Sequence, residues 1–255
     1  MSVGVHGPPI IQVEDLVAGY GETVILDRIS FEVYEGEIFV ILGGSGCGKS
    51  TLLRHLVGLQ PPLAGRIRIA DEVVDPNDEA GYQRILASIG ILYQSGALFG
   101  SMTVAENVAL PIREYTSLPP RAVANLVRLK LGLVGLAGYE GHYPSQLSGG
   151  MRKRAGLARA MALNPRILFF DEPSAGLDPV TSAELDELIL DLNRRLGTTM
   201  VLVTHELASI FAVGQRVIML DRQSRGIIAT GVPEELRRHS PNPQVRRFFD
   251  RQPAS

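Results

Sequence analysis

The segment GGSGCGKST, at positions 43–51, constrains the fold of this chain more than any other. It matches the pattern G-x-x-x-x-G-K-[ST], with Lys49 and Ser50 at its close, and it leads into the helix-like sequence STLLRHLVGL. Glycines let consecutive backbone N–H groups approach phosphate oxygens without a clashing Cβ, and the lysine adds a positive charge. A continuously apolar run precedes the segment, so we expect a phosphate-binding loop between a buried strand and a helix.

The overall composition predicts a single domain spanning 1–255. The chain is 45% hydrophobic and 20% charged, which is enough apolar sequence for a sizeable core. Its net charge of −2, with acids and bases interspersed, argues against nucleic acid as a partner. A single cysteine, no signal-peptide pattern at 1–10 and no apolar run of about 20 residues indicate the cytosol. We therefore expect any membrane role to depend on a partner.

Local patterns predict an alternation of strands and helices. Continuously apolar runs predict three parallel strands buried on both faces, at 38–44, 167–172 and 200–206. The segment 24–37 alternates apolar and polar residues, which predicts a half-exposed antiparallel strand. Between the last two parallel strands, Asp178 is suited to an N-cap, Pro179 to the first helical position and Gly197 to a stop. We therefore expect a strand–helix–strand crossover there.

The middle of the chain is mostly helical in pattern. Thr103 and Glu106 have the spacing of a capping box, and a further helix is expected from Gly149 until Pro165 ends it. The sequence VPEELRRHSPNPQVRRFFD predicts two short helices near the end of the chain. We therefore expect an α/β core with a C-terminal helical tail and an inserted helical subdomain, at 1–94 with 165–255 and at 95–164, respectively.

The start of that further helix is a second candidate anion site. Ser148 as N-cap and the N–H groups of Gly149 and Gly150 are suited to binding an anion, because unpaired donors and the positive dipole end converge there. In isolation the same residues are consistent with a helix cap that faces water. A basic run follows and predicts a solvated or interfacial helix face rather than a nucleic-acid patch: Arg152, Lys153 and Arg154.

Two carboxylates and a histidine end predicted strands, and we expect their strands to lie beside the phosphate loop. Asp171 is suited to a magnesium ion, directly or through water, and Glu172 to orienting and deprotonating an attacking water. His205 is placed to contact a γ-phosphate or that water. Two adjacent acids alone would favour an exposed strand end, and a lone histidine a structural role. The strand-end positions favour the site.

These segments, taken in order, resemble the motifs of the ATPase subunits of ABC transporters. They are the phosphate loop as Walker A, LYQSGALF with Gln94, LSGGM at 147–151, Walker B at 167–171 with Glu172, SAGLD at 174–178, and His205. The resemblance spans nearly the whole chain. It implies an α/β fold with a P-loop NTPase (RecA-like) core, an antiparallel β subdomain and an inserted helical subdomain.

The resemblance implies an ATPase that uses ATP and Mg²⁺. Tyr20 would stack on adenine, with an ordinary edge-strand position as the alternative. Asp178 would belong to the D-loop. Catalytic roles fall to Glu172, His205 and Gln94, and metal-binding roles to Ser50, Gln94 and Asp171. Nucleotide contacts are implied along the whole loop: Gly43, Gly44, Ser45, Gly46, Cys47, Gly48, Lys49, Ser50 and Thr51. Cys47 would gain thiolate character near cations, although a small, tolerated residue is the simpler interpretation.

By the same resemblance, a second copy of the chain is a partner. The two copies would meet head to tail, so that Ser148, Gly149 and Gly150 of one chain cap the γ-phosphate of the ATP held by the other. Two positions depart from the family pattern: Met151 stands where Gln is usual, and Gly44 where many members have Pro. Neither change removes a phosphate ligand, but the first leaves open the polar contact that Gln would make.

The segment SGALFGSMTVAENVALPIREYTSLP and the later NPQVRRFF are similar to the ATPases of the Mce/Mla phospholipid-trafficking systems. This likeness implies a peripheral subunit on the cytoplasmic face of a bacterial inner membrane, with integral-membrane permease subunits and an Mce-domain lipid-binding protein as partners. Ala97, Leu98 and Phe99 would bind a cytoplasmic helix of the permease, or else pack the core of the helical subdomain. An importer of amino acids or another small solute is the alternative function. A soluble nucleic-acid-associated ATPase would need a second cassette or a long coiled-coil insertion, and the sequence shows neither.

Overall fold

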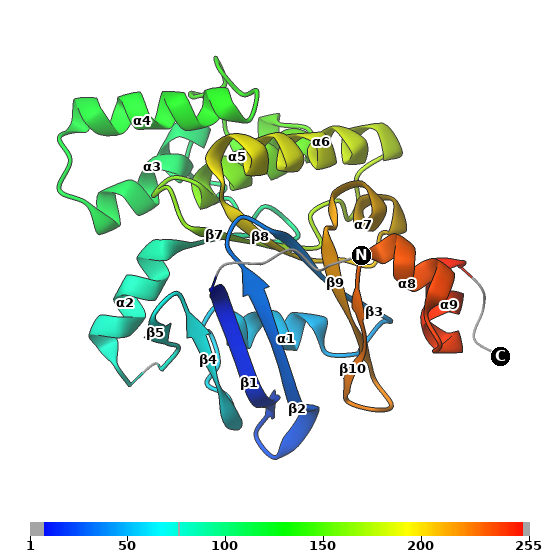
Figure 1. Cartoon of the computed structure of the whole chain (residues 1–255). Helices are drawn as coiled ribbons and strands as arrows, with labels where there is room; N and C mark the ends of the chain where they lie inside the picture. Colours follow the sequence, from blue (N-terminus) through cyan, green and yellow to red (C-terminus); the bar gives the residue numbers. More distant parts are fainter. Residues whose placement is uncertain (1–7, 76, 252–255) are drawn as a thin grey trace.

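The computed structural model describes residues 8–75 and 77–251, whose strands form two sheets (Figure 1). The larger sheet has the order β10-β9-β3-β8-β7-β6, in which β10 is antiparallel to β9 and the other neighbours are parallel. The three predicted parallel strands are confirmed as β3, β7 and β8. The bounds are Ile38–Gly43 (β3), Ile89–Leu92 (β6), Ile167–Asp171 (β7), Thr199–Val203 (β8), Arg216–Asp221 (β9) and Gly226–Gly231 (β10).

The central strand β3 is buried on both faces, because side chains of successive strand residues point to opposite sides of the sheet. Val40 and Leu42 pack into the core on one face, and Phe39 and Ile41 into the core on the other. The helix α1 (Lys49–Leu56) lies between the two sheets, where it contacts both β1 and β3 (Figure 1). The continuous apolar pattern of β3 therefore reflects a layer on each side.

The smaller sheet is antiparallel, with the order β2-β1-β4-β5. Its strands are β1 (Pro9–Tyr20), β2 (Thr23–Tyr34), β4 (Ala64–Ile69) and β5 (Glu72–Val73). The predicted half-exposed antiparallel strand is confirmed, since the second half of β2 alternates buried and exposed residues. β1 lies between β2 and β4, but its pairing with β4 ends at Val17, so Tyr20 pairs with β2 alone. The helix α2 (Glu79–Ser88) connects this sheet to β6.

Helices occupy most of the chain between β6 and β7, as predicted. They are α3 (Val104–Tyr115), α4 (Pro120–Leu133), the short 3₁₀ helix η1 (Pro144–Gln146) and α5 (Gly149–Ala160). The predicted capping box is confirmed: the Thr103 N–H donates to Glu106 Oε2 at 2.7 Å, and the Glu106 N–H donates to Thr103 Oγ1 at 3.2 Å. The subdomain boundaries themselves stay a prediction.

The helix α5 ends earlier than predicted. Its last residue is Ala160, its C-cap is Met161, and Asn164 before Pro165 adopts a left-handed conformation with φ of 53°. A proline disfavours the helical conformation in the preceding residue, and the chain here leaves the helix several residues before that restriction applies. The helix length was therefore overestimated.

The crossover between β7 and β8 is confirmed as α6 (Pro179–Leu196). Asp178 caps it by accepting bonds from the N–H groups of Val180 and Thr181, both at 3.1 Å, and Gly197 ends it with φ of 64°. The strand that ends at Asp171 does not pair with the strand of the phosphate loop, because β8 lies between β3 and β7. A sequence pattern gives the ends of strands but not their order across a sheet.

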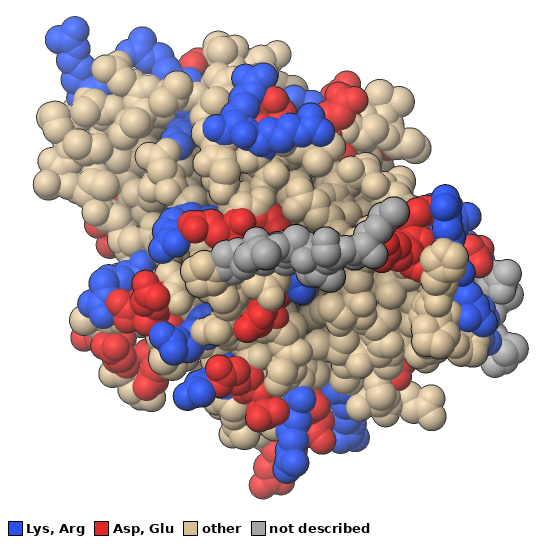
Figure 2. All heavy atoms as spheres, viewed as in Figure 1, with Lys and Arg blue, Asp and Glu red and all other residues tan. Residues whose placement is uncertain are grey.

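The end of the described chain forms the two predicted short helices, α8 (Pro233–His239) and α9 (Pro243–Phe249), after α7 (Leu207–Val213) and the β9–β10 hairpin. On the face in Figure 2, acidic and basic side chains are intermixed over the lower part of the molecule. Within the described residues, no helix is long and apolar enough to span a membrane. Most of the segment 1–10, which bears on a leader peptide, lies outside the described residues.

Candidate functional site

The phosphate loop connects β3 to α1 and has a backbone that requires glycine. Gly43 has φ of 150° and a Cβ there would lie 2.4 Å from the carbonyl oxygen of Leu220, while Gly48, the N-cap of α1, has φ of 103°. The Lys49 Nζ donates to the carbonyl oxygens of Gly43 and Gly44, at 2.9 and 3.2 Å. The predicted strand–loop–helix context is thus confirmed, with the lysine folded over the loop.

The loop exposes some of its predicted contact residues and buries others. Gly44, Ser45, Gly46 and Ser50 are exposed, whereas Thr51 and Cys47 are buried. Burial raises the pKa of the Cys47 thiol, and this outweighs the opposite effect of the Lys49 charge. The structure therefore favours the interpretation of Cys47 as a small packed residue over that of a reactive thiolate.

Tyr20 reaches the phosphate loop from the end of β1. Its hydroxyl lies 3.3 Å from Thr51 Oγ1 and accepts a bond from Arg54 Nη1 at 2.9 Å. The Arg54 guanidinium also lies 6.0 Å from the centroid of the tyrosine ring. Tyr20 as a whole is 42% exposed, which leaves it accessible beside the loop to a stacking partner. The sequence pattern of α1 does not distinguish Arg54 for this contact.

Asp171 and Glu172 follow one another at the end of β7, with different environments. Burial, and then the neighbouring Glu172 charge, raise the pKa of Asp171, while the charges of Arg54 and Lys49 act in the opposite direction. Asp171 therefore lies within electrostatic range of the phosphate loop even though β8 separates their strands. Its raised pKa reflects a carboxylate removed from water beside a second carboxylate, and a bound cation would stabilise its charged form.

Glu172 is held by contacts on its backbone and its side chain. Its φ of 47° is uncommon for a residue other than glycine, its N–H donates to the Val203 carbonyl at 2.8 Å, and Oε1 lies 2.9 Å from Nδ1 of His205. Its Oε2 is buried and has no hydrogen-bond partner among the described residues. A buried carboxylate oxygen without a donor is costly unless a water or ligand reaches it. The structure thus brings together Glu172 and His205, two of the predicted site residues.

The helix α5 contributes a residue that sequence analysis misassigned. Lys153 was expected on a solvated or interfacial face, but it is 5% exposed and its Nζ donates to the Glu172 carbonyl oxygen at 3.2 Å. Its neighbours at helical spacing, Gly150, Gly156 and Leu157, are buried too. This spacing indicates that Lys153 lies on the inner face of the helix. The two arginines beside Lys153 in the sequence instead favour an exposed position.

The remainder of that basic run lies closer to the surface, as expected. Arg152 is exposed and its Nη1 donates to the Leu147 carbonyl at 2.7 Å, while Arg154 pairs with Glu184 at 2.9 Å. Ser148 is the N-cap of α5 and its Oγ accepts a bond from the Met151 N–H at 3.2 Å. The helix therefore begins at an exposed serine, as the sequence predicted.

Gln94 follows β6, the edge strand, and its side chain is exposed. The next segment contains Phe99, which is 51% exposed, and Leu98, which is half-buried and packs against the core. Exposed Phe99 is therefore consistent with binding a partner, whereas half-buried Leu98 is consistent with packing in the core of the helical subdomain. A groove of about 370 Å³ lies beside Phe99, and its lining includes Leu86, Pro111, Tyr115, Arg159 and Leu163.

A second buried polar network, also absent from the predictions, joins α6 to α7. Asp186 is 6% exposed, bonds to the Ser209 hydroxyl, and leaves Oδ1 without a partner among the described residues. Burial raises the pKa of Asp186. Ser209 Oγ in turn donates to Ser174 Oγ at 3.4 Å, just beyond Glu172 in the chain. Nothing in the sequence pattern of α6 distinguished this aspartate.

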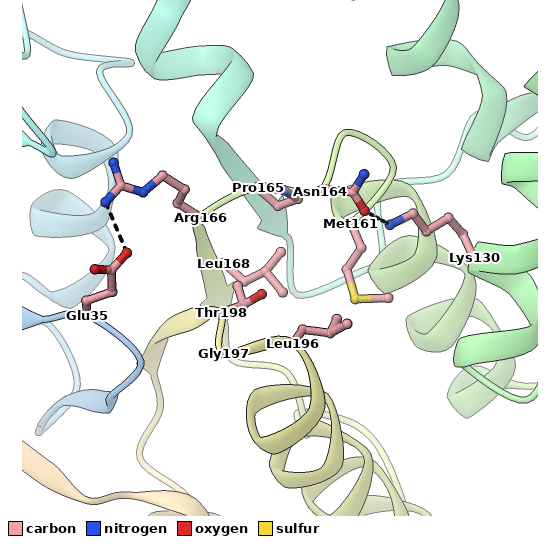
Figure 3. Close-up of a pocket in the computed structure, with 10 residues that line it drawn as sticks. All are labelled: Glu35, Lys130, Met161, Asn164, Pro165, Arg166, Leu168, Leu196, Gly197 and Thr198. Atoms are coloured by element: carbon pink, nitrogen blue, oxygen red, sulfur yellow. Dashed lines mark hydrogen bonds and ion pairs between the residues drawn. The ribbon is translucent and has the colours of Figure 1, made fainter.

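A separate pocket lies at the opposite end of β7 from Asp171 (Figure 3). It has a volume of about 370 Å³ and lies between the Arg166–Glu35 ion pair and Lys130. Lys130 is 3% exposed and its Nζ donates to Asn164 Oδ1 at 2.5 Å. Burial lowers the pKa of this ammonium. The pocket therefore contains a buried lysine that is remote from the strand ends that carry the candidate catalytic groups.

Comparison with known proteins identifies the family. The family model described as ABC transporter matches residues 26–175. The intermembrane phospholipid transport system ATP-binding protein MlaF of Escherichia coli strain K12 is 40% identical over 94% of this chain and 88% of that protein. The probable ribonucleotide transport ATP-binding protein mkl of Mycobacterium leprae is also 40% identical, over 94% of this chain and 68% of that protein.

Solved structures share the fold. The cbiO1 protein of Clostridium perfringens, part of an ABC transporter complex, has a TM-score of 0.82 and 30% identity, covering 90% of each chain. The dimeric ATP-binding cassette MJ0796, in a post-hydrolysis state bound to ADP and Pi, has a TM-score of 0.77 and 29% identity, covering 87% of this chain and 98% of that one. The phosphate loop, the paired strand-end carboxylate and histidine, and these matches agree, and the chain belongs to the ABC transporter family as one of its ATP-hydrolysing, ATP-binding subunits.

Proposed function

We propose that two copies of this chain bind ATP between them and hydrolyse it to drive a transporter of phospholipid or another lipid in a bacterial membrane. The observation that carries the lipid assignment is the likeness to MlaF, which extends over 88% of that protein. The methionine import ATP-binding protein MetN of Geobacillus kaustophilus is as similar, at 40%, but the match covers 67% of it. The likeness to the phospholipid system therefore extends over more of the relative.

The proposed nucleotide site is built around the phosphate loop. The exposed backbone of Gly44 and Gly46 offers N–H donors to phosphate oxygens, and Lys49 adds its charge to the β- and γ-phosphates. The exposed ring of Tyr20 is available to stack on the adenine base. The left-handed glycines support this assignment, because a Cβ at Gly43 would lie against the Leu220 carbonyl and one at Gly48 against Ile25, so the loop keeps this shape only with glycine there.

The proposed metal is Mg²⁺, held by the Ser50 hydroxyl, Asp171 and Gln94 together with phosphate oxygens. Among the described residues, no group of three or more His, Cys, Asp or Glu side chains is arranged to hold a metal. One carboxylate, a hydroxyl and an amide oxygen, together with phosphate oxygens, form a donor set expected for Mg²⁺. This ion binds through one or two carboxylates plus substrate phosphates rather than a protein cage. The ion would neutralise charge that develops on the phosphates.

Glu172 is the proposed general base, and His205 orients it. The His205 contact occupies Oε1, which leaves the buried Oε2 as the acceptor for a proton from water. His205 is itself 58% exposed, so its ring is also within reach of a γ-phosphate that enters the site. In the proposed dimer, Ser148, Gly149 and Gly150 of the partner complete the shell around that phosphate, and Asp178 orders the segment beside it.

The groove beside Phe99 is the proposed contact with a permease. Asn107 fixes the Phe99 backbone by donating to its carbonyl at 3.1 Å and accepting from its N–H at 2.8 Å, so the aromatic ring is held outward. Arg159 of α5 also donates to the carbonyl oxygens of Gly96 and Ala97. An apolar groove with a rigid rim is suited to a short cytoplasmic helix of a membrane protein. In this proposal, the contact holds the subunit at the cytoplasmic face of the inner membrane.

Affinity purification of the tagged full-length chain from detergent-solubilised membranes tests the transport assignment. Recovery of a permease with an Mce-domain protein, and phospholipid in the purified complex, supports lipid transport. Recovery of a permease with a small-solute binding protein instead supports the importer alternative. ATP hydrolysis by the purified chain is measured in parallel, so that loss of the lipid assignment leaves the ATPase assignment separately decided.

A further inference from the structure

Lys153 connects the first turns of α5 to the backbone of Glu172 in the same chain. Its Nζ lies 3.2 Å from the Glu172 carbonyl oxygen, and the residue is almost fully buried. The same helix begins at the exposed N-cap Ser148. One rigid helix therefore carries both the exposed serine and the lysine that contacts the backbone of the candidate general base.

The burial of Lys153 is unusual enough to need a compensating interaction. An ammonium group is rarely buried without a partner, because removing it from water is costly. Burial lowers the pKa of Lys153, whereas the charges of Glu172 and Asp171 act in the opposite direction. Its compensation thus comes from the Glu172 carbonyl and from the two carboxylates at the end of β7.

The Glu172 carbonyl is a sensitive position because its residue has a strained backbone. The left-handed φ of 47° persists when surrounding contacts hold it. The carbonyl accepts bonds from Lys153 Nζ and from the Ala175 N–H at 3.2 Å, while the Glu172 N–H is held by Val203 of β8. Removing the Lys153 bond frees one of these restraints and lets the carboxylate move relative to His205.

We propose that Lys153 is a positioning residue for Glu172 and that α5 thereby connects the two ATP sites of the dimer. The inference rests on the proposed function, in which the start of α5 caps the nucleotide of the partner while Glu172 acts on the nucleotide of its own chain. Movement of α5 as it engages the partner's nucleotide reaches Glu172 through Lys153.

The first test is Lys153→Met, which keeps an unbranched side chain and removes the ammonium. We expect kcat for ATP hydrolysis to fall by about ten- to a hundredfold, with the affinity for ATP changed by less than about twofold, because the phosphate loop is intact. Lys130→Met is the matched control (Figure 3), since Lys130 is a similarly buried lysine whose Nζ bonds to Asn164. It removes a buried ammonium elsewhere and should leave kcat within about twofold.

Mixed dimers with differential tags then decide which site Lys153 serves. When one protomer carries Lys153→Met and its partner carries Ser148→Arg, the proposal puts both lesions in one ATP site and leaves the other intact. Activity should therefore exceed that of either parent homodimer by about fivefold or more. When the partner instead carries Glu172→Gln, the lesions fall in different sites, and no such gain is expected.

The alternatives give other patterns. If Lys153 acts only by shaping the start of α5 for the partner's nucleotide, the Glu172→Gln pair recovers activity and the Ser148→Arg pair does not. That pattern would overturn the proposal. Recovery in both pairs, or in neither pair, would also overturn it. So would an unchanged kcat in the Lys153→Met homodimer. A pair of Lys49→Ala and Ser148→Arg calibrates the method, because it tests the head-to-tail arrangement alone. Nucleotide occlusion is measured beside hydrolysis in this pair. If the pair shows neither, the proposed dimer is itself refuted and the inference falls with it.

Discussion

The Nδ1 atom of His205 lies 2.9 Å from Oε1 of Glu172 and so links the ends of the neighbouring strands β8 and β7. One carboxylate oxygen is committed to this contact, and the other is buried without a donor. The pair therefore has one oxygen that fixes orientation and one that remains an acceptor. Substitution of Glu172 therefore tests the role of the acceptor oxygen.

Glu172→Gln should retain ATP binding and lose most turnover. The substitution keeps the size of the side chain and leaves Lys49 untouched, but an amide cannot accept the proton from water. We expect kcat to fall by about 10²- to 10⁴-fold and ATP-bound dimers to accumulate. Steady-state hydrolysis and size-exclusion chromatography with ATP measure both effects. Glu184→Gln, at an exposed glutamate that pairs with Arg154, is the control, and near-normal hydrolysis by Glu172→Gln would refute its role.

Lys49→Ala should weaken nucleotide binding itself. The lysine folds over the loop through bonds to the Gly43 and Gly44 carbonyls, and its charge is the proposed partner of the phosphates. We expect the Kd for ATP to rise by about ten- to a hundredfold, equivalent to about 1.4–2.7 kcal/mol. Isothermal titration calorimetry measures this change, and circular dichroism verifies the fold. Unchanged affinity in a folded variant counts against the loop as the nucleotide site.

Phe99→Asp and Leu98→Asp should have different consequences. Phe99 is exposed beside the groove, so its substitution should release the subunit from the permease while leaving thermal stability nearly unchanged. Leu98 packs against the core, so its substitution should lower the free energy of unfolding by about 2–4 kcal/mol. Leu129→Asp, at a residue 57% exposed on α4, is the control for surface charge.

Co-purification with the permease and thermal melting separate these outcomes. A Phe99→Asp variant that is stable and still bound to the permease would remove the groove as the docking surface. A Leu98→Asp variant as stable as the wild type would contradict the assignment of that side chain to the core.

Asp186→Asn should change how stability depends on pH. Burial raises the pKa of Asp186 in the folded state above its unfolded value of about 3.9, so the folded chain retains this proton to higher pH. The resulting stabilisation is complete below about pH 3.9 and is lost as the pH rises through the folded pKa. The Tm of Asp186→Asn minus that of the wild type should therefore increase between about pH 4 and pH 7.

A matched aspartate on the same helix provides the control for that measurement. Asp191 is exposed enough to pair with Arg195 at 2.7 Å, and Asp191→Asn should give a Tm difference that changes little over the same range. A flat difference for Asp186→Asn as well would mean that burial of this carboxyl has no net linkage to folding.

The elements predicted well are those with local signals. The apolar run of β3, the caps at Asp178 and Gly197, and the capping box at Thr103 each depend on residues close together in the sequence. The order of strands depends instead on pairing between distant segments, and for that reason the position of β8 between β3 and β7 was not predicted. Local chemistry determines an element, whereas its neighbours follow from the packing of the whole chain.

The site divides in a similar way. The phosphate loop, Glu172 and His205 were found because their residue types and strand-end positions carry chemistry. The contacts that support them were missed: Lys153 stands in a basic run, and Arg54 is an ordinary residue on the exposed face of α1. A supporting contact depends on whether a side chain is buried and where it points in the folded chain. The residue type of a charged residue in a polar segment indicates neither.

The strand that carries the phosphate loop pairs on both sides with strands that leave the ribosome much later. Ile38 of β3 is in register with Met200 of β8, and Phe39 with Arg216 of β9. Synthesis proceeds at about 5–20 residues per second, so β3 waits about 10 seconds or more without its neighbours. Until then the backbone N–H and C=O groups along both of its edges have no partner strands, and long-range pairing of this kind folds slowly. Nascent chains halted before β9 should therefore depend on chaperones, and ATP binding should arise only near the end of translation.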